Sequence, residues 1–315
     1  MVVSVTPQQS VSPEGRSVDE CLYLTGRPTL REFLRYVRTH ATTQPGKGTL
    51  TDEWHAAHDI VSELAATEAG CADDPPMAPL GPEYEGLLLD LLKDPLVRFG
   101  FNTVPTDVAL VELDRLVVYQ KHIDLAFALR LEQTLGPAPD HEQIFRACLA
   151  SDHPRPPATW AREHDDSFVF VSPSNDLRFL GAMRLEQTDI TNHAPPGAVV
   201  GVVGIAVGFS ANFLNALYAE KRLILNNGSH RAYALHRLGV SHVPCIVQHV
   251  PSREALDVLA PAALRRDPDG YLRQPRPPML KDYFDTRLHT VLPVRRRTHQ
   301  VTIRVKVEAS SLPAV

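Results

Sequence analysis

Residues 223–247 constrain the fold more than any other stretch of the chain. The segment opens with Leu223-Ile224-Leu225, an apolar run that is typical of a buried strand. Asn226 to Arg231 follow, and Asn and Gly tolerate the left-handed backbone conformations that a sharp strand-to-helix turn requires. A helix is predicted over residues 231–238 and a second strand over residues 243–247. The pattern predicts a strand–loop–helix–strand unit, and we expect a functional site in its loop.

The rest of the chain divides into a helical part and a strand-rich part. Apolar residues at helical spacing predict helices in the first hundred residues, whereas strands predominate after Pro105. This organisation predicts an α+β protein. We expect four parts: a disordered tail over residues 1–25, a helical cap over 26–104, a domain over 105–250 with an insertion near 140–195, and a C-terminal extension over 251–315 that packs on the core and ends in a strand-forming tail.

Charge and cysteine content limit the classes of protein. The formal net charge is -5 and the pI is about 6.3, which argues against a protein that coats nucleic acid, although a local basic patch is compatible with these values. The four cysteines are far apart and form no CxxC pair, so we expect buried thiols in a reducing compartment and a cytoplasmic protein. His55 and His58 have no third ligand nearby in the sequence, so we expect no metal site.

Residues 198–219 contain no charged residue and reach the roughly 20 residues that a membrane-spanning helix needs. The first half is rich in Val, Gly and Ile, and the second half contains Asn212 and Asn215. This composition favours two buried strands, over residues 199–207 and 213–219, and we expect no membrane span. A tight turn at residues 220–222 is predicted to join the second strand to the next one.

The loop has the chemistry of an anion site. Ser229 is predicted to cap the helix, whose first amides then point outward at the positive end of the helix dipole. His230 adds a titratable donor and Arg231 a fixed planar charge. An ordinary capped helix with a solvated His and Arg explains the same residues, and the pattern alone does not choose between these two interpretations.

The loop and its flanks resemble a known signature. The run Leu-Ile-Leu-Asn-Asn-Gly-Ser-His-Arg, a short helix, Leu-Gly and then Val-Pro before a strand resembles the core motif of the ParB/sulfiredoxin-like superfamily. Residues 111–116 and 120–124 resemble the first strand of that superfamily and the loop that enters its first helix. The resemblance implies a mixed sheet and a site for the phosphates of a nucleotide, lined by Asn227, Gly228, Ser229, His230 and Arg231, with Lys121 or His122 opposite.

Three departures from the superfamily pattern limit the function. Ser229 stands where sulfiredoxins have a nucleophilic cysteine, so sulfinic acid reduction is not expected. Asn227 stands where the amino-acid kinases of the superfamily have Asp, so the carboxylate for phosphotransfer would come from elsewhere. The candidates are Glu112, Asp114 and Asp124. Residues 252–290 are Pro-rich and predict no helix-turn-helix pair, so we do not expect a partitioning ParB.

Two functions follow as expectations. The first is an ATP-dependent phosphotransferase that acts with Mg²⁺ on a small molecule or peptide. In this hypothesis Arg231 neutralises transition-state charge, His230 donates to a phosphoryl oxygen, and a carboxylate activates the acceptor. The second is a non-catalytic nucleotide-binding switch, or a module of ParB-like fold that interacts with a protein or a nucleic acid. Nucleic acid and membrane are not expected as partners.

Overall fold

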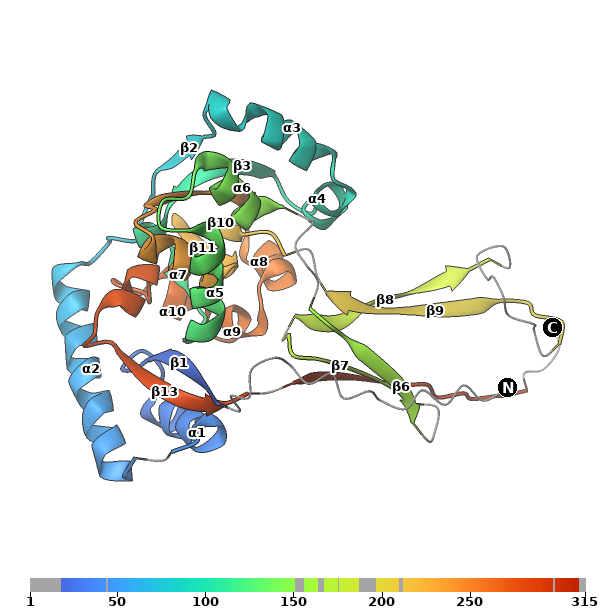
Figure 1. Ribbon diagram of the computed structural model, residues 1–315, viewed down its shortest axis with the longest axis horizontal. Helices are drawn as coiled ribbons and strands as arrows, with labels where there is room; N and C mark the ends of the chain where they lie inside the picture. Colours follow the sequence, from blue (N-terminus) through green and yellow to red (C-terminus); the bar gives the residue numbers. More distant parts are fainter. Residues whose placement is uncertain are drawn as a thin grey trace.

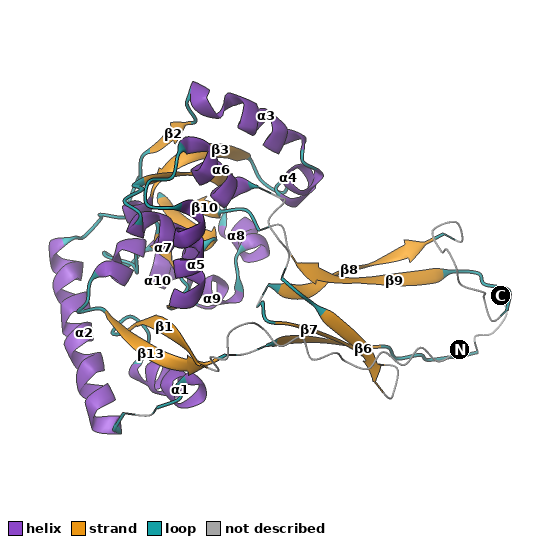
Figure 2. Cartoon of the chain, in the orientation of Figure 1, coloured by secondary structure: helices purple, strands orange, loops and turns teal. Residues whose placement is uncertain are grey.

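A computed structural model of the protein describes residues 18–43, 45–150, 156–163, 167–174, 176–186, 197–209, 212–296 and 298–311. Figure 1 shows a body of mixed helices and strands and an arm that extends from one side of it. Helices and strands are both abundant and the strands form several separate sheets, so the α+β architecture is confirmed. In Figure 2 the arm contains strands only, whereas the helices all belong to the body.

The body is organised around a six-stranded mixed sheet. β10 runs parallel to β12 and β11 runs parallel to β4, while β10 pairs with β11, and β3 with β2 and β12, in the antiparallel sense. Both faces of the sheet are covered, which is why its central strands are almost continuously apolar. In spatial order the strands are β2 (Met77–Pro79), β3 (Thr106–Glu112), β12 (His242–His249), β10 (Asn215–Ala219), β11 (Arg222–Asn227) and β4 (Val117–Val118).

A two-residue turn joins β10 to β11, as the tight turn in the sequence predicted. Its residues, Glu220 and Lys221, both have positive φ values of 44° and 69°. Positive φ at both central residues is the geometry that matches the twist of a two-residue hairpin. Arg253 and Arg273 form ion pairs with Glu220, so residues of the C-terminal extension stabilise this strained turn.

One face of the sheet is covered by three helices. Leu223 and Leu225 of β11 pack into a core cluster with residues of these helices. The helices are α5 (Leu125–Leu135), α6 (His141–Leu149) and α7 (Ser229–Arg237). The predicted insertion near 140–195 therefore begins too early, because α6 is part of the core: Phe145, Cys148 and Leu149 are buried.

The other face is covered by the C-terminal extension. Ile224 and Leu217 point into a second cluster with Leu256, Leu264 and Leu272. Those leucines come from three short helices in a segment where the sequence predicted no helix-turn-helix pair, and a short 3-10 helix follows them. These elements are α8 (Arg253–Leu259), α9 (Ala262–Arg266), α10 (Pro268–Leu272) and η4 (Leu280–Phe284).

The predicted helical cap is not a single unit. Two of its helices pack with a three-stranded sheet through Phe33, Val37 and Leu50. The other two lie by β2 and α6, at a different part of the body (Figure 1). The first pair is α1 (Leu30–His40) and α2 (Lys47–Thr67), and the second pair, after η1 (Pro82–Tyr84), is α3 (Glu85–Lys93) and α4 (Pro95–Gly100).

The three-stranded sheet also corrects the predicted disordered tail. Its order is β13 (His289–Arg295), β1 (Val18–Leu24) and β5 (His122–Asp124). β1 is therefore a strand within the predicted tail over residues 1–25, stabilised because Cys21, Leu22, Tyr23 and Leu24 are buried. Residues 1–17 lie outside the described residues.

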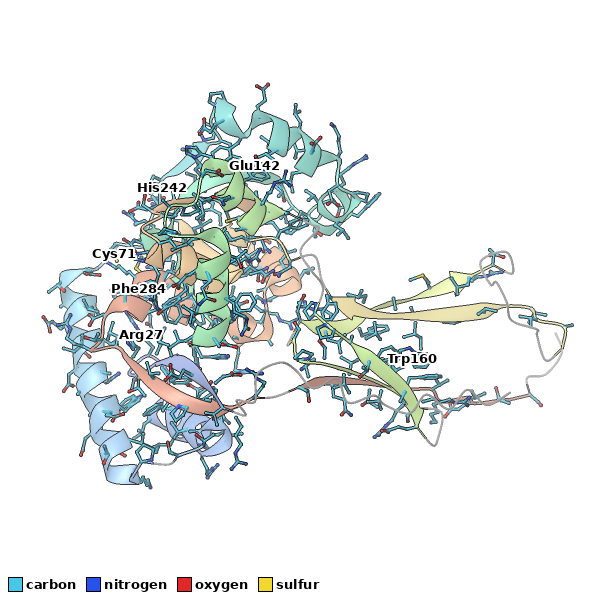
Figure 3. The ribbon with its side chains drawn as sticks, viewed as in Figure 1. Arg27, Cys71, Glu142, Trp160, His242 and Phe284 are labelled. Carbon is cyan, nitrogen blue, oxygen red and sulfur yellow. The ribbon has the colours of Figure 1, made fainter. Side chains whose placement is uncertain are left out.

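The arm consists of two small sheets. One has three strands in the order β14 (His299–Arg304), β7 (Ser167–Ser172) and β6 (Thr159–Glu163), and the other is the ribbon β8 (Leu177–Leu185) and β9 (Val202–Phe209). Trp160 of β6 is labelled on the arm in Figure 3, away from the labelled residues of the body such as Phe284. The two strands expected within residues 198–219 are β9 and β10. Only β10 is buried, because β9 lies in the arm and not in the central sheet.

Among the helices that the structure describes, none combines the length and the apolar composition that crossing a bilayer requires.

Candidate functional site

The candidate site lies at the edge of the six-stranded sheet where two neighbouring parallel strands end. β4 pairs with β11 so that Val118 lies opposite Leu225. After β4 the chain continues through β5 into α5, and after β11 it enters α7, and these two helices pack against each other. Because carboxyl ends of parallel strands meet at one edge of a sheet, residues 119–124 and 226–231 come together there.

The turn after β11 is fixed by sterics and hydrogen bonds. Gly228 has a φ of +102°, and a Cβ there would lie 3.0 Å from Cγ of Leu214. Glycine is therefore required by both conformation and space. Asn226 donates through Nδ2 to Oδ1 of Asn215 at 2.9 Å, and its carbonyl oxygen accepts from the Tyr119 hydroxyl at 2.6 Å. The last bond links the two segments of the edge.

The predicted cap of α7 is wrong. Gly228, not Ser229, is the residue at the N-cap position, and no side chain caps the helix. Ser229 is instead the first helical residue and is buried. Asn227 donates through Nδ2 to the carbonyl oxygen of Phe213 at 3.1 Å and to Oδ1 of Asn212 at 3.3 Å, so this amide holds the turn. The backbone amides of the first turn of α7 therefore lack a side-chain acceptor among the described residues.

Arg231 is engaged inside the protein. Its Nη1 donates to the carbonyl oxygens of Ala147 at 3.2 Å, Cys148 at 3.1 Å and Asn212 at 2.6 Å, and its Nη2 donates to Oδ1 of Asn212 at 3.0 Å. Two of these acceptors belong to the last turn of α6, where carbonyl groups lack helical partners and the helix dipole places a partial negative charge. The expected role of Arg231 in neutralising transition-state charge is not supported, since a buried guanidinium with these acceptors is a structural cation.

His230 faces α5 and has an unsatisfied nitrogen. Its ring lies 5.4 Å from that of Phe127 in an edge-on arrangement. Its Nε2 is buried and has no hydrogen-bond partner among the described residues. Burial, assisted by the positive charges of His122 and Arg231, lowers the pKa of His230 to about 4. The imidazole is therefore neutral at pH 7, and a buried nitrogen without a partner is a place where a ligand could bind.

Lys121 is on the segment after β4, and its side chain contacts α1. Its ammonium group lies 3.2 Å from Oε2 of Glu32, and both side chains are about one-third exposed, at 34% and 32%. Although burial alone would raise it, the pKa of Glu32 is lowered by hydrogen bonds from Thr29 and by Lys121. An open pocket of about 320 Å³ adjoins Lys121, and it is lined by Tyr23, Glu32, Arg35, Tyr36, Thr39, His40 and Lys121.

His122 and Asp124 lie between Lys121 and α5. Burial lowers the pKa of His122, the charge of His40 lowers it further, and Asp124 raises it. Asp124 is the N-cap of α5, where its Oδ1 accepts from the backbone N–H of Phe127 at 3.0 Å. Of the three carboxylates proposed to activate an acceptor, Asp124 is therefore the one at this edge, and it is already occupied as a cap.

Glu112 and Asp114 lie at the opposite end of α7. Glu112 lies opposite His242, at the start of β12, in the register of β3 and β12. Asp114 accepts from Nε2 of His236 at 2.8 Å, and His236 is in the last turn of α7. At ~1.5 Å per residue, that turn is about 10 Å along the helix from Ser229. The structure therefore does not bring these two carboxylates to the loop: β3 ends at the same end of the sheet as β11, but β12 and β10 lie between the two strands.

Sequence reasoning missed three residues of this edge. Tyr119 and Phe127 can be assigned to the site only once β4 is known to lie beside β11. Glu32 comes from α1, in a part of the chain that the sequence assigned to a separate cap. No group of three or more His, Cys, Asp or Glu side chains within the described residues is arranged to hold a metal ion.

Comparisons of the chain with protein-family models, with curated proteins and with solved structures find no match.

Proposed function

We propose that the protein binds a nucleotide through its phosphates at the edge where β4 and β11 end, and that it acts as a non-catalytic switch or interaction module. The observation that carries the proposal is the meeting of two segments at that edge. One segment starts α7 at Gly228 without a side-chain cap, and the other presents Lys121. Backbone amides at a helix start bind phosphate oxygens, and an ammonium group on the neighbouring segment can add to that binding. This arrangement also fits the proposal of a ParB/sulfiredoxin-like fold.

His230 adds a second, independent reason to expect a ligand. A buried imidazole nitrogen without a partner loses hydrogen-bonding free energy relative to water, and a bound group recovers it. Because the low pKa keeps the ring neutral at pH 7, His230 can donate a hydrogen bond to a phosphate without titrating. Lys121 can exchange its partly exposed contact with Glu32 for a phosphate oxygen, since exposed ion pairs of this kind contribute little free energy.

The contacts of the candidate catalytic groups favour binding over phosphotransfer. Arg231 is held by Ala147, Cys148 and Asn212 and is not available to a transferring phosphoryl group. Phosphotransfer also needs a carboxylate that orients or activates the acceptor, and Asp124 already accepts a hydrogen bond as the cap of α5. Mg²⁺ fits the binding proposal as an ion that the nucleotide phosphates themselves hold, with few or no ligands from the protein.

The experiment that tests the proposal is a thermal-shift titration of the full chain with ATP, CTP and GTP, each with and without Mg²⁺. A nucleotide at about 100 times its dissociation constant stabilises a fold by roughly 2.7 kcal/mol, which is readily measured. We expect a shift with at least one nucleotide and no release of its terminal phosphate during long incubation. The absence of a shift with any of them contradicts the proposal, and steady nucleotide turnover contradicts its non-catalytic part.

A further inference from the structure

The ribbon of β8 and β9 exposes apolar side chains on both of its faces. Pairing of the two strands places Phe179 beside Val207 and Ala182 beside Ile205 on one face. Leu180 and Met183 lie on the opposite face, over the glycines of β9. Phe179, Leu180 and Met183 are each about half exposed, and Val203 is 71% exposed. A two-stranded ribbon is only marginally stable in water by itself, and additional paired strands stabilise it.

The two edges of the ribbon differ. The β8 edge carries Arg178 and Arg184, and its register is interrupted by a bulge at Leu180. Charges and bulges are the devices that keep an edge strand from pairing with another chain. The β9 edge has neither: Val202–Phe209 contains no charged residue, no proline and no bulge. Within the described residues no strand pairs with that edge.

β9 has the pattern of a strand that can pair with a copy of itself. Val203, Ile205, Val207 and Phe209 alternate with the smaller residues Val202, Gly204, Ala206 and Gly208. When two identical antiparallel strands are related by a two-fold axis perpendicular to the sheet, residues opposite each other lie on the same face. Large residues then meet large ones and small residues meet small ones. Pairing of two β9 strands also places no charged residue at the interface, whereas pairing of two β8 strands would bring arginines together.

We propose that the protein forms a two-fold dimer in which β9 of one protomer pairs in the antiparallel sense with β9 of its partner. The two ribbons then form one four-stranded sheet whose outer edges are the guarded β8 strands, so the assembly closes at two copies and does not grow into a filament. This interface is separate from the nucleotide site and does not depend on it.

The test is the mass of the full chain in solution, measured by sedimentation equilibrium over a range of concentrations, for the wild type and two matched variants. Val203→Glu puts a carboxylate on the seam, while Arg184 opposite Val203 on β8 offers it a partner that keeps the ribbon intact. Val258→Glu, on α8, makes the same change at a valine with nearly the same exposure, 73% against 71%.

We expect a dimer for the wild type and for Val258→Glu, and a dissociation constant raised at least about tenfold for Val203→Glu. A monomeric wild type would overturn the proposal and leave the edge to another protein. Species larger than dimers, or equal dissociation in both variants, would overturn it as well.

Cysteine cross-linking tests the register. A two-fold axis between antiparallel strands falls at one residue, which faces its own copy. Single cysteine variants at positions 203–207 should therefore cross-link strongly at one position and weakly at its neighbours. Uniform cross-linking along β9, or none at any position, would contradict the paired-strand geometry.

Discussion

The Nη1 of Arg231 on α7 donates to the carbonyl oxygen of Cys148 at 3.1 Å, in the last turn of α6. The same nitrogen reaches Ala147 of that turn and the backbone of Asn212 just before β10. One buried guanidinium group thus donates hydrogen bonds to carbonyl oxygens at the end of α6 and just before β10, and these acceptors surround its positive charge. The sequence predicts that Arg231 is part of a ligand site, whereas its contacts show that it stabilises the core.

Arg231→Ala should therefore reduce the stability of the fold. Its removal leaves the carbonyl oxygens of Ala147, Cys148 and Asn212 buried without their donor, which costs about 3–5 kcal/mol of the free energy of unfolding. Urea denaturation followed by circular dichroism measures this loss. A change below about 1 kcal/mol would show that the guanidinium has no structural role.

His230 should make stability depend on pH. Its folded-state pKa of about 4 lies below the ordinary value of 6.5, so the unfolded chain takes up a proton first as the pH falls. The contribution is complete above pH 6.5, is lost on acidification between pH 6.5 and 4, and amounts to at most ~3 kcal/mol. Denaturation curves of the wild type and His230→Gln should diverge in their pH dependence over this window. His299→Gln, at an exposed position on β14, should follow the wild type, and parallel curves for His230→Gln would refute the assignment.

Gly228 should tolerate alanine less well than Gly239. Both residues have positive φ, at 102° and 81°, so alanine is strained at either position by about 1–3 kcal/mol. A Cβ at Gly228 also approaches Leu214, whereas a Cβ at Gly239 has nothing within 4 Å. The free energy of unfolding should fall further for Gly228→Ala than for Gly239→Ala. Equal losses would mean that the contact with Leu214 relaxes without cost.

Asp282 should be required to hold the C-terminal segment to the N-terminal one. It accepts from Arg27 at 2.7 Å and from Arg276, and the three side chains are only 1–4% exposed. Asp282→Asn leaves the buried guanidinium group of Arg27 without its counter-ion and Arg276 with Glu68 alone, and it should lower the free energy of unfolding by about 3–5 kcal/mol. Asp90→Asn, which breaks an exposed pair with Lys93, should change it little. The two variants are compared in the same denaturant series, and similar small losses would contradict the buried network.

The sequence predicted the elements around the loop because its apolar runs are unambiguous. β11, α7 and β12 lie where the strand–loop–helix–strand pattern predicted them. The short turn at Glu220 and Lys221 requires β10 and β11 to pair as a hairpin. The same information could not show which way a side chain points. Ser229 has the residue type of a helix cap, but the left-handed Gly228 takes that position and pushes Ser229 into the helix.

Long-range neighbours account for the other errors. Two of the acceptors of Arg231 come from α6, about 80 residues earlier in the chain, and no local pattern reveals them. Asp114 follows β3, which ends at the same end of the sheet as β11, but β12 and β10 separate the two strands, and Asp114 contacts His236 in the last turn of α7. β9 was expected to be buried from its composition alone, but burial depends on what packs against a strand, and in the two-stranded ribbon of the arm β9 is only partly buried.

The central claim is that a nucleotide binds at the edge that Lys121 shares with the start of α7, and calorimetric titration of two lysine variants tests it most directly. Lys121→Gln and Lys281→Gln remove the same charge from similar ion pairs, whose lysines are 34% and 33% exposed. With the nucleotide that stabilises the wild type, we predict unchanged affinity for Lys281→Gln and affinity at least about tenfold weaker for Lys121→Gln. Equal affinity in both variants would contradict the claim that the phosphates bind at this edge.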